Sequence, residues 1–205
     1  KMGIEYLLFR RGPLTMAPSQ FGIFTKSNKR FDTPNIEFHI QPLSLDGFGK
    51  PLHKFPALTV SVCNLRPLSR GTVSLSSANP FDKPKIAPNY LSDYEDQQVA
   101  VESIMKAREL MATNEMAIFE PEEFLPGKHF IKPEELVQEA GKISTTIFHP
   151  VGTAKMGSHD DPMAVVNEKL KVRGFKNLRV VDGSVMPVIT SGNTHTPIVM
   201  IAEKA

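Results

Sequence analysis

Histidines are the residues of this sequence best suited to transfer protons near neutral pH, because imidazole changes its charge in that range. Two of the six stand apart from the others. His149 precedes a proline, which restricts the backbone around it and favours a rigid loop that presents one imidazole. His195 follows Asn193 and Thr194, where we expect the last helix to begin. The alternatives are a half-buried His149 bonded to a backbone carbonyl, and a His195 that only follows the helix cap.

The other four histidines favour structural or solvated positions. His39 points outward from a predicted strand, on the opposite side from Phe38. His53, His129 and His159 lie among lysine, proline and aspartate in predicted loops, where a solvated surface position is the simplest interpretation. We therefore assign no chemistry to these four.

Several common catalytic and nucleotide-binding motifs are absent from the sequence. Residues 47–52 (GFGKPL) lack the third glycine of a dinucleotide-binding turn and do not open a helix. There is no Walker loop and no H-E-x-x-H motif, and the run from Asp182 to Ser184 lacks the second glycine of a nucleophile elbow. A serine hydrolase that uses Ser184, Asp182 and a histidine stays open as an alternative. The N-terminus of the last helix could also bind an anionic group.

The composition is that of an ordinary globular protein. The chain has 205 residues, 40% of them hydrophobic and 22% charged, which suffices for a hydrophobic core and excludes a disordered chain. The net charge of +2, with no block of like charges, argues against a nucleic-acid-binding or membrane-surface protein. Cys63 is the single cysteine, so neither an internal disulfide nor a multi-cysteine metal site is available, and we predict no metal.

Targeting signals are not evident either. Apolar stretches such as residues 198–202 are far shorter than the ~18 residues that a membrane-spanning helix needs. The apolar run from Tyr6 to Phe9 is too short for a signal-peptide core, and we expect a cytoplasmic location. The start at Lys1 indicates a chain cut from a longer one.

Strands and loops are expected over the first 90 residues, because many of the 17 prolines interrupt that part. Alternating apolar residues predict strands at 35–40, 57–65 and 71–76, which we expect to share one antiparallel sheet. A second group of elements follows: a helix over 92–113 opened by a capping box at Ser92 and Glu95, a shorter helix from Pro133, a strand at 178–182 and a helix from Asn193. Segregated strands and helices predict an α+β fold.

Motifs in the last third of the chain, taken together, resemble the C-terminal part of the glucose-methanol-choline (GMC) oxidoreductases. They are, in order, HPVGTAKMG at 149–157, VVN at 165–167, LKVRG at 170–174, LRVVDGSVMP at 178–187, GNTHTP at 192–197 and IAEKA at 201–205. Upstream, LRPLSRGTV at 65–73, SANPF at 77–81 and PNYLS at 88–92 resemble the substrate-binding domain of that family. The resemblance extends over nearly the whole chain.

The resemblance implies an architecture and a cofactor. Residues 1–145 would form the antiparallel-sheet substrate-binding domain with flanking helices. Residues 146–205 would form a C-terminal segment that belongs to the FAD domain of the full-length enzyme. FAD is the implied cofactor, and the N-terminal FAD domain, missing from this chain, is the implied partner.

The same resemblance implies the site residues. His149 matches the catalytic base, which takes the hydroxyl proton of an alcohol while a hydride leaves the carbon for the flavin. His195 matches a second catalytic position, filled by histidine or asparagine among members, that orients the alcohol oxygen. Asp182, Gly183, His195 and Thr196 match flavin contacts.

Three positions depart from common family patterns. Phe148 stands where several members have tyrosine, Ala154 where many have cysteine, and Asn167 where many have aspartate. Phe148 lacks a hydroxyl, so we expect an apolar wall beside the reacting carbon. The other two changes are expected to be neutral.

The implied function is that of the C-terminal part of an FAD-dependent alcohol oxidoreductase, which oxidises a choline-like or other primary alcohol to an aldehyde. The isolated chain is expected to be inactive. The alternative is a catalytically silent domain that acts only in protein association, including a homo-oligomer. For that case we expect exposed apolar faces at Leu178, Val180, Ile198, Met200 and Ile201.

Overall fold

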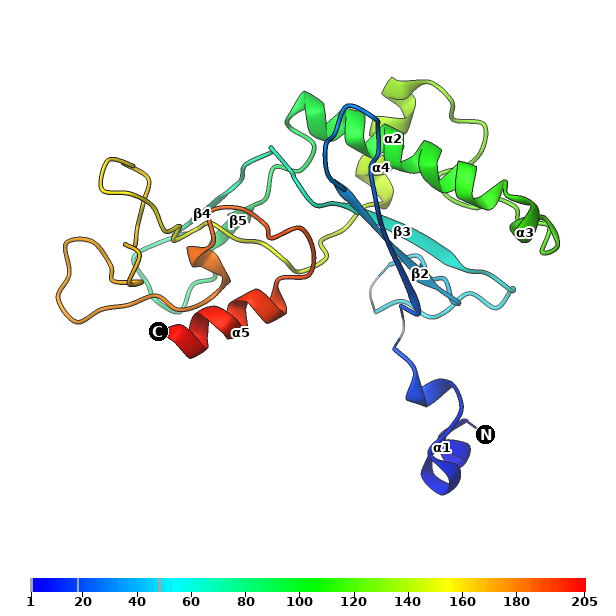
Figure 1. Ribbon diagram of the computed structural model, residues 1–205, viewed down its shortest axis with the longest axis horizontal. Coiled ribbons are helices and arrows are strands. Elements are labelled where there is room, and N and C mark those ends of the chain that lie inside the picture. The colour runs from blue at the N-terminus through cyan, green and yellow to red at the C-terminus, as the bar shows by residue number, and fades with distance from the viewer. Residues whose placement is uncertain (1, 18, 48) are drawn as a thin grey trace. The chain divides into compact units, whose positions relative to one another are not determined.

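The computed structural model describes residues 2–17, 19–47 and 49–205 and mixes helices with antiparallel sheets (Figure 1). This is the expected α+β fold. The chain divides into two compact units, residues 1–63 and residues 64–205. In the described part of the chain, no helix is both long enough and apolar enough to cross a membrane.

A three-stranded sheet forms the centre of the first unit. Its strands are β1 (Phe21–Thr25), β2 (Ile36–Gln41) and β3 (Thr59–Asn64), in the order β1-β2-β3. β1 and β2 are antiparallel. The predicted strands at 35–40 and 57–65 are confirmed, whereas β1 lies in a stretch for which no strand was predicted.

A polar side chain fixes the turn between β1 and β2. The side-chain oxygen of Asn35 accepts a hydrogen bond from the Ser27 backbone N–H at 2.8 Å, and its amide donates to the Ser27 hydroxyl at 3.0 Å. Both residues are buried. Beyond this turn β2 buries Ile36 and Phe38 on one face and Glu37 on the other, where His39 also lies. The expectation that His39 points outward is wrong, because its Nε2 is buried and lies 3.4 Å from the Glu37 carboxylate.

The first unit also contains helix α1 (Met2–Phe9) and a 3-10 turn, η1 (Pro13–Thr15). The expectation of strands and loops alone is wrong for this segment. The first proline of the chain is Pro13, so nothing in residues 2–9 prevents a short helix.

Two helices pack together in the second unit: α2 (Tyr94–Met111) and α4 (Pro133–Ile143), with the short α3 (Asn114–Ala117) between them in sequence (Figure 1). Both long helices are confirmed, and Pro133 occupies the first turn of α4 as expected. The predicted capping box at the start of α2 is wrong. Asp93, not Ser92, caps this helix, since its carboxylate accepts a hydrogen bond from the Glu95 N–H at 2.8 Å.

The buried face of α2 also differs from the one that its apolar residues predict. The fully buried positions are Asp96, Val99 and Ser103. Asp96 is buried because its carboxylate accepts hydrogen bonds from the Leu68 and Ser69 N–H groups at 2.9 and 2.7 Å. These hydrogen bonds hold the loop at residues 68–69 against α2, and they allow a charged side chain to be buried.

Arg108 of α2 closes the loop between α3 and α4. Its Nε and Nη2 donate to the two carboxylate oxygens of Glu123, each at 2.9 Å, and Nη1 donates to the Phe130 carbonyl. Burial by itself would raise the pKa of Glu123, but the hydrogen bonds and charge of Arg108 outweigh burial and hold that pKa below its ordinary value.

The predicted strand at 71–76 is shorter and lies in a different sheet. β4 (Thr72–Ser74) pairs antiparallel with β5 (Lys85–Ala87) in a separate two-stranded sheet. Gly71 permits the close approach that starts this pairing, because a Cβ at that position would lie 2.2 Å from the Ala87 carbonyl oxygen. The expectation of one shared sheet failed because the partner strand β5 lies within a proline-rich segment that suggests only turns.

The C-terminal part of the second unit is built from loops around a small core. Val166, Leu170 and Val185 are buried there, with Met156, Val172, Val180, Val181 and Ile201 packed against them. Residues 178–182 do not form the predicted strand; Arg179 makes an isolated bridge with Lys171. A 3-10 turn, η2 (Gly183–Val185), follows, and the predicted last helix is present as α5 (His195–Lys204).

Candidate active site

Two loop segments that carry the sequence-predicted site residues are joined by backbone hydrogen bonds. The Ala154 N–H donates to the Ser184 carbonyl at 3.0 Å, and the Met156 N–H donates to the Val185 carbonyl at 2.8 Å. Residues 150–156 therefore run beside residues 183–187, and His149 stands at the end of this pairing.

Helix α5 joins the same assembly through Gly183. A Cβ at Gly183 would lie 3.0 Å from Cδ1 of Ile198 on α5 and 3.8 Å from the Pro150 carbonyl oxygen. Asp182, just before it, is exposed and accepts a hydrogen bond from the Ser184 N–H at 2.8 Å. The structure thus brings His149, the Asp182–Gly183 pair and the start of α5 together.

The imidazole of His149 is held through both of its ring nitrogens. Asn193 Nδ2 lies 2.9 Å from Nε2, and the Thr194 hydroxyl lies 3.0 Å from Nδ1. Because the Asn193 amide nitrogen donates, Nε2 is the acceptor, and Nδ1 carries the proton and donates to Thr194. Thr194 is buried and Asn193 is exposed. The ring is therefore fixed in one tautomer, with its basic nitrogen at the exposed edge.

The residue before His149 has an unusual backbone conformation. Phe148 has φ +62° and an exposed fraction of 66%. A left-handed conformation costs a non-glycine residue about 1–2 kcal/mol. Such conformations occur often at functional sites, where the surrounding structure holds them.

His195 and Thr196 begin α5 and are both exposed. Within the described residues, no hydrogen bond joins His195 to His149. Thr194 does not cap α5 with its hydroxyl, so this helix begins without a side-chain cap from its N-cap residue. Sequence reasoning assigned Asn193 and Thr194 to capping and missed their contacts with His149; their position just before His195 was the available signal.

The loop after residue 154 is stabilised by charge. Lys155 Nζ lies 2.8 Å from the carboxylate of Asp161, and this hydrogen bond holds the pKa of Asp161 below its ordinary value. Arg173 adds hydrogen bonds to the Gly157 and Ser158 carbonyls at 2.9 and 2.7 Å.

The hydrolase alternative finds no support in this geometry. The Ser184 hydroxyl donates to Asp182, and in the part of the chain that the structure describes no histidine is hydrogen-bonded to that serine. The arrangement lacks the base that would activate a serine nucleophile.

The histidines set aside on sequence differ in their surroundings. His159 is exposed as expected. His53 is not in solvent: Nδ1 lies 2.7 Å from the Ser44 hydroxyl and Nε2 lies 3.0 Å from Asp46. The His53 N–H also donates to the Ser44 carbonyl, so these contacts close the loop between the two residues.

Comparison with known proteins finds similar sequences along nearly the whole chain. A family model described as GMC oxidoreductase matches residues 67–202. The alcohol dehydrogenase [acceptor] of Pseudomonas putida is 42% identical over 98% of this chain and 36% of its own length. The oxygen-dependent choline dehydrogenase of Staphylococcus epidermidis is 38% identical over 100% of this chain and 36% of its own length. The chain thus spans about a third of the length of these curated relatives.

Solved structures with a similar fold cover most of this chain. Pyridoxine 4-oxidase from Mesorbium loti superposes with a TM-score of 0.80 at 27% identity, over 91% of this chain and 36% of the other. A variant of formate oxidase from Aspergillus oryzae RIB40 superposes with a TM-score of 0.82 at 26% identity, over 99% of this chain and 40% of the other.

Proposed function

We propose, from the premise that this chain belongs to the GMC oxidoreductase family, that it supplies the proton-transfer residues of an FAD-dependent alcohol oxidoreductase. The holoenzyme consists of this chain joined to the family's FAD-binding domain. Its substrate is a primary alcohol, choline-like or otherwise, which it oxidises to an aldehyde. The observation that carries the proposal is the imidazole of His149, held by Asn193 and Thr194 with Nε2 as the acceptor.

The start of α5 fits one end of a flavin. Its N-cap residue supplies no side-chain cap, and a helix N-terminus favours electron-rich oxygen and nitrogen atoms. His195 and Thr196 are exposed at the start of α5, Asp182 is exposed, and the Gly183 backbone lies against Ile198 of the same helix. We assign these four residues to flavin contacts. Bound FAD would supply the acceptor for the hydride that leaves the alcohol carbon.

In this proposal His149 is the general base. Its Nε2 accepts the hydroxyl proton of the alcohol once the substrate displaces the exposed Asn193 amide. Thr194 keeps the Nδ1 proton bound on the other side, so the imidazolium that forms remains hydrogen-bonded through Nδ1. His195, at the start of the same helix, donates to the alcohol oxygen and orients it. Close alignment of this kind lowers the entropic part of the barrier.

The test is turnover in the holoenzyme. His149→Gln should reduce flavin reduction by a primary alcohol by roughly 10²–10⁴-fold, the usual effect of losing a general base. Flavin absorbance per protein should stay near that of the unmodified enzyme. His159→Gln, which removes an exposed histidine, is the matched control and should keep full activity. Turnover near normal in His149→Gln would end the assignment.

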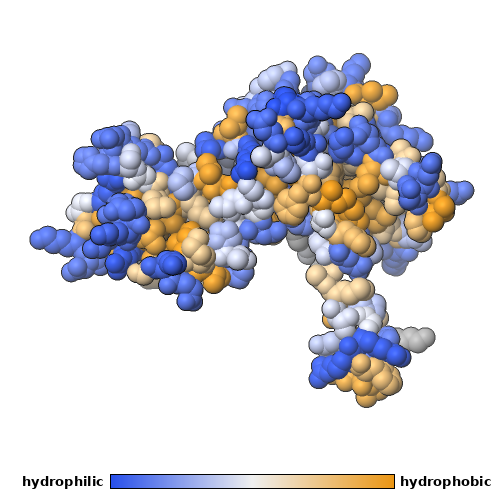
Figure 2. All heavy atoms as spheres, viewed as in Figure 1, coloured by the Kyte–Doolittle hydropathy of each residue, from blue (hydrophilic) through white to orange (hydrophobic). Residues whose placement is uncertain are grey.

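A second candidate function, protein association by the chain alone, is favoured by its exposed apolar side chains. Leu178 and Met200 are 46% and 54% exposed, as expected. Val180, Ile198 and Ile201 were also expected at the surface, but all three are partly buried: Val180 and Ile201 pack against the C-terminal core, and Ile198 lies against Gly183. Helix α1 adds Ile4, Leu7 and Leu8, each more than 60% exposed, and Figure 2 shows apolar spheres gathered over this helix.

Absorbance and light scattering of the isolated chain test whether it depends on the FAD-binding domain. A chain that needs the FAD-binding domain should stay colourless after incubation with excess FAD and should self-associate through its apolar faces. A compact monomer that turns stably yellow would contradict this dependence on a second domain.

A further inference from the structure

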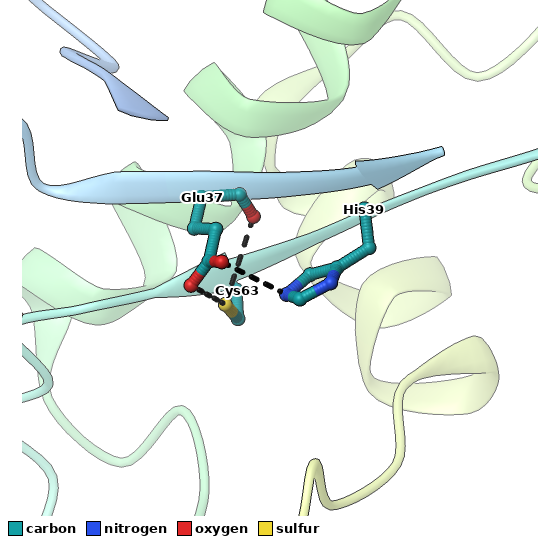
Figure 3. Close-up of side chains that lie close together, drawn as sticks. All are labelled: Glu37, His39 and Cys63. Carbon is teal, nitrogen blue, oxygen red and sulfur yellow. Dashed lines mark hydrogen bonds and ion pairs between the residues drawn. The ribbon is translucent and has the colours of Figure 1, made fainter. Parts of the chain in front are cut away.

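Three side chains with different metal-binding atoms meet on the sheet of the first unit. Glu37 and His39 stand two residues apart on β2, on the same face, and Cys63 lies on the adjacent strand β3 (Figure 3). His39 Nε2 is 3.4 Å from one carboxylate oxygen of Glu37, and Cys63 Sγ is 4.0 Å from the other. One ligand atom from each residue lies within 4.8 Å of the others.

The polar atoms of this cluster are poorly satisfied. Glu37 is only 4% exposed, and removing a carboxylate from water costs several kcal/mol unless a positive charge or strong hydrogen bonds offset the loss. His39 Nε2 is buried and has no hydrogen-bond partner in the described part of the chain. The Cys63 thiol makes only long contacts with Glu37, at 3.6 and 4.0 Å.

The Cys63 thiol is protonated in these surroundings, so a bound cation would have to displace its proton. Burial, together with the neighbouring Glu37 carboxylate, raises the pKa of the Cys63 thiol to about 11. A cation placed among the three atoms would satisfy the carboxylate and the imidazole at once.

We propose that Glu37, His39 and Cys63 form a binding site for one Zn²⁺ ion, with a water molecule as the fourth ligand. The choice of ion follows from the atoms: zinc accepts thiolate, imidazole and carboxylate together in tetrahedral geometry. Its bonds of roughly 2.0–2.3 Å imply ligand separations of about 3.3–3.6 Å in a tetrahedron. The 3.4 and 4.0 Å distances run to different oxygens of Glu37, and one ligand atom from each residue lies within 4.8 Å of the others, so side-chain rotation has to bring the three atoms closer to reach that range.

Charge and protons balance in this site. A zinc–sulfur bond forms as the Cys63 thiol proton leaves to solvent, and no electrons are transferred. Glu37 binds as a carboxylate, and His39 binds through its Nε2 lone pair and keeps the proton on Nδ1. The two negative ligands neutralise the ion, so no net charge is buried. Because neighbouring strands fix the three backbone positions, little order has to be created on binding.

The experiment titrates the full chain with Zn²⁺ and, separately, with Co²⁺. We expect one equivalent of zinc to bind and the cobalt form to show the near-ultraviolet absorption of a cobalt–thiolate bond. Cys63→Ser and His39→Gln should each weaken zinc binding by on the order of tenfold to a hundredfold or more, the scale already seen on loss of outer-shell partners. Far-ultraviolet circular dichroism checks that each variant is folded.

Two control variants locate the ion. His53→Gln removes the other histidine of the first unit, and His159→Gln removes an exposed histidine beside Asp160. Neither should change zinc affinity. A variant series in which His53→Gln abolishes binding while Cys63→Ser does not would overturn the proposal.

A measurement on the unmodified chain avoids any folding defect of the variants. Cys63 is the single cysteine, so its alkylation by iodoacetamide reports on one sulfur. One equivalent of Zn²⁺ should change the rate of this reaction, because the ion replaces the thiol proton and binds a lone pair of the sulfur. An alkylation rate that is the same with and without Zn²⁺, or cobalt binding without the thiolate absorption, would also overturn it.

Discussion

The hydroxyl of Thr194 lies 3.0 Å from Nδ1 of His149, at the position where a threonine would otherwise cap the helix that follows. One buried residue therefore both fixes the His149 tautomer and leaves the start of α5 without a side-chain cap. The two parts of the proposed chemistry, proton transfer and flavin contact, depend on this single hydrogen bond.

Thr194→Val should weaken proton transfer by His149. Valine has nearly the same shape but cannot accept a hydrogen bond from the Nδ1 N–H. The neutral ring then loses its preference for the tautomer in which Nδ1 carries the proton and Nε2 is the base. We expect kcat of the holoenzyme to fall by roughly tenfold, the kinetic equivalent of about 1.4 kcal/mol and within the cost of one lost buried hydrogen bond, with KM little changed. Thr194→Ser keeps the hydroxyl and should restore kcat. Equal activity in all three proteins would argue against a positioning role.

Asn193→Asp should change the pH dependence of turnover. A carboxylate beside Nε2 favours the charged imidazolium, which cannot act as a base. The acidic limb of the kcat/KM profile should therefore move to higher pH, and activity at high pH should be retained. Asn193→Ala supplies the comparison, since it removes the contact without adding a charge. A limb that stays in place in Asn193→Asp would show that a group other than His149 sets it.

His195→Asn should be milder than His195→Ala. An amide can still donate to an alcohol oxygen at this position, whereas alanine cannot. We expect kcat in steady-state measurements, and the flavin reduction rate in rapid-mixing measurements, to be highest in the unmodified enzyme, lower in His195→Asn and lowest in His195→Ala. Identical losses in the two variants would mean that His195 does not orient the substrate.

Glu123→Gln should destabilise the chain in a pH-dependent way. The folded-state pKa of Glu123 is lowered, so its contribution is fully present above the unfolded value, about pH 4.3, and is lost as the pH falls through the folded value. At pH 7 we expect a loss of roughly 1–3 kcal/mol in urea unfolding. The difference from the unmodified chain should shrink as the pH falls below about 4. The exposed neighbour Glu122 provides the control: Glu122→Gln should have little effect at either pH.

Local signals in the sequence were sufficient for α2, α4 and α5 and for two strands of the first sheet, whereas α1 and α3 were not predicted. Pro133 at a helix start and the periodic residues of 94–111 act through nearby backbone, so they predict α4 and α2 correctly. They do not say which face is buried. Asp96 is interior only because the Leu68 and Ser69 N–H groups come to it from a distant segment.

The same limit applied to the candidate site. The family resemblance identified His149 and His195 as candidates, but nothing local to Asn193 or Thr194 indicates a partner 44 or 45 residues away. A threonine before a helix predicts a cap, and only the approach of the 149–156 loop gives its hydroxyl another use. The cluster of Glu37, His39 and Cys63 was missed for a related reason, since its third member comes from a separate strand.

The pairing of residues 150–156 with residues 183–187 affects which substitutions this part of the chain can tolerate. Main-chain amides and carbonyls at Ala154, Met156, Ser184 and Val185 make this connection, and every residue except proline offers the same groups. Met156 and Val185 belong to the C-terminal core, but the Ala154 side chain does not, so it can be exchanged while the backbone that ends at His149 keeps its course. A library randomised at position 154 should retain many active members and lose those with proline, which makes this loop a suitable place to diversify the chain in directed evolution.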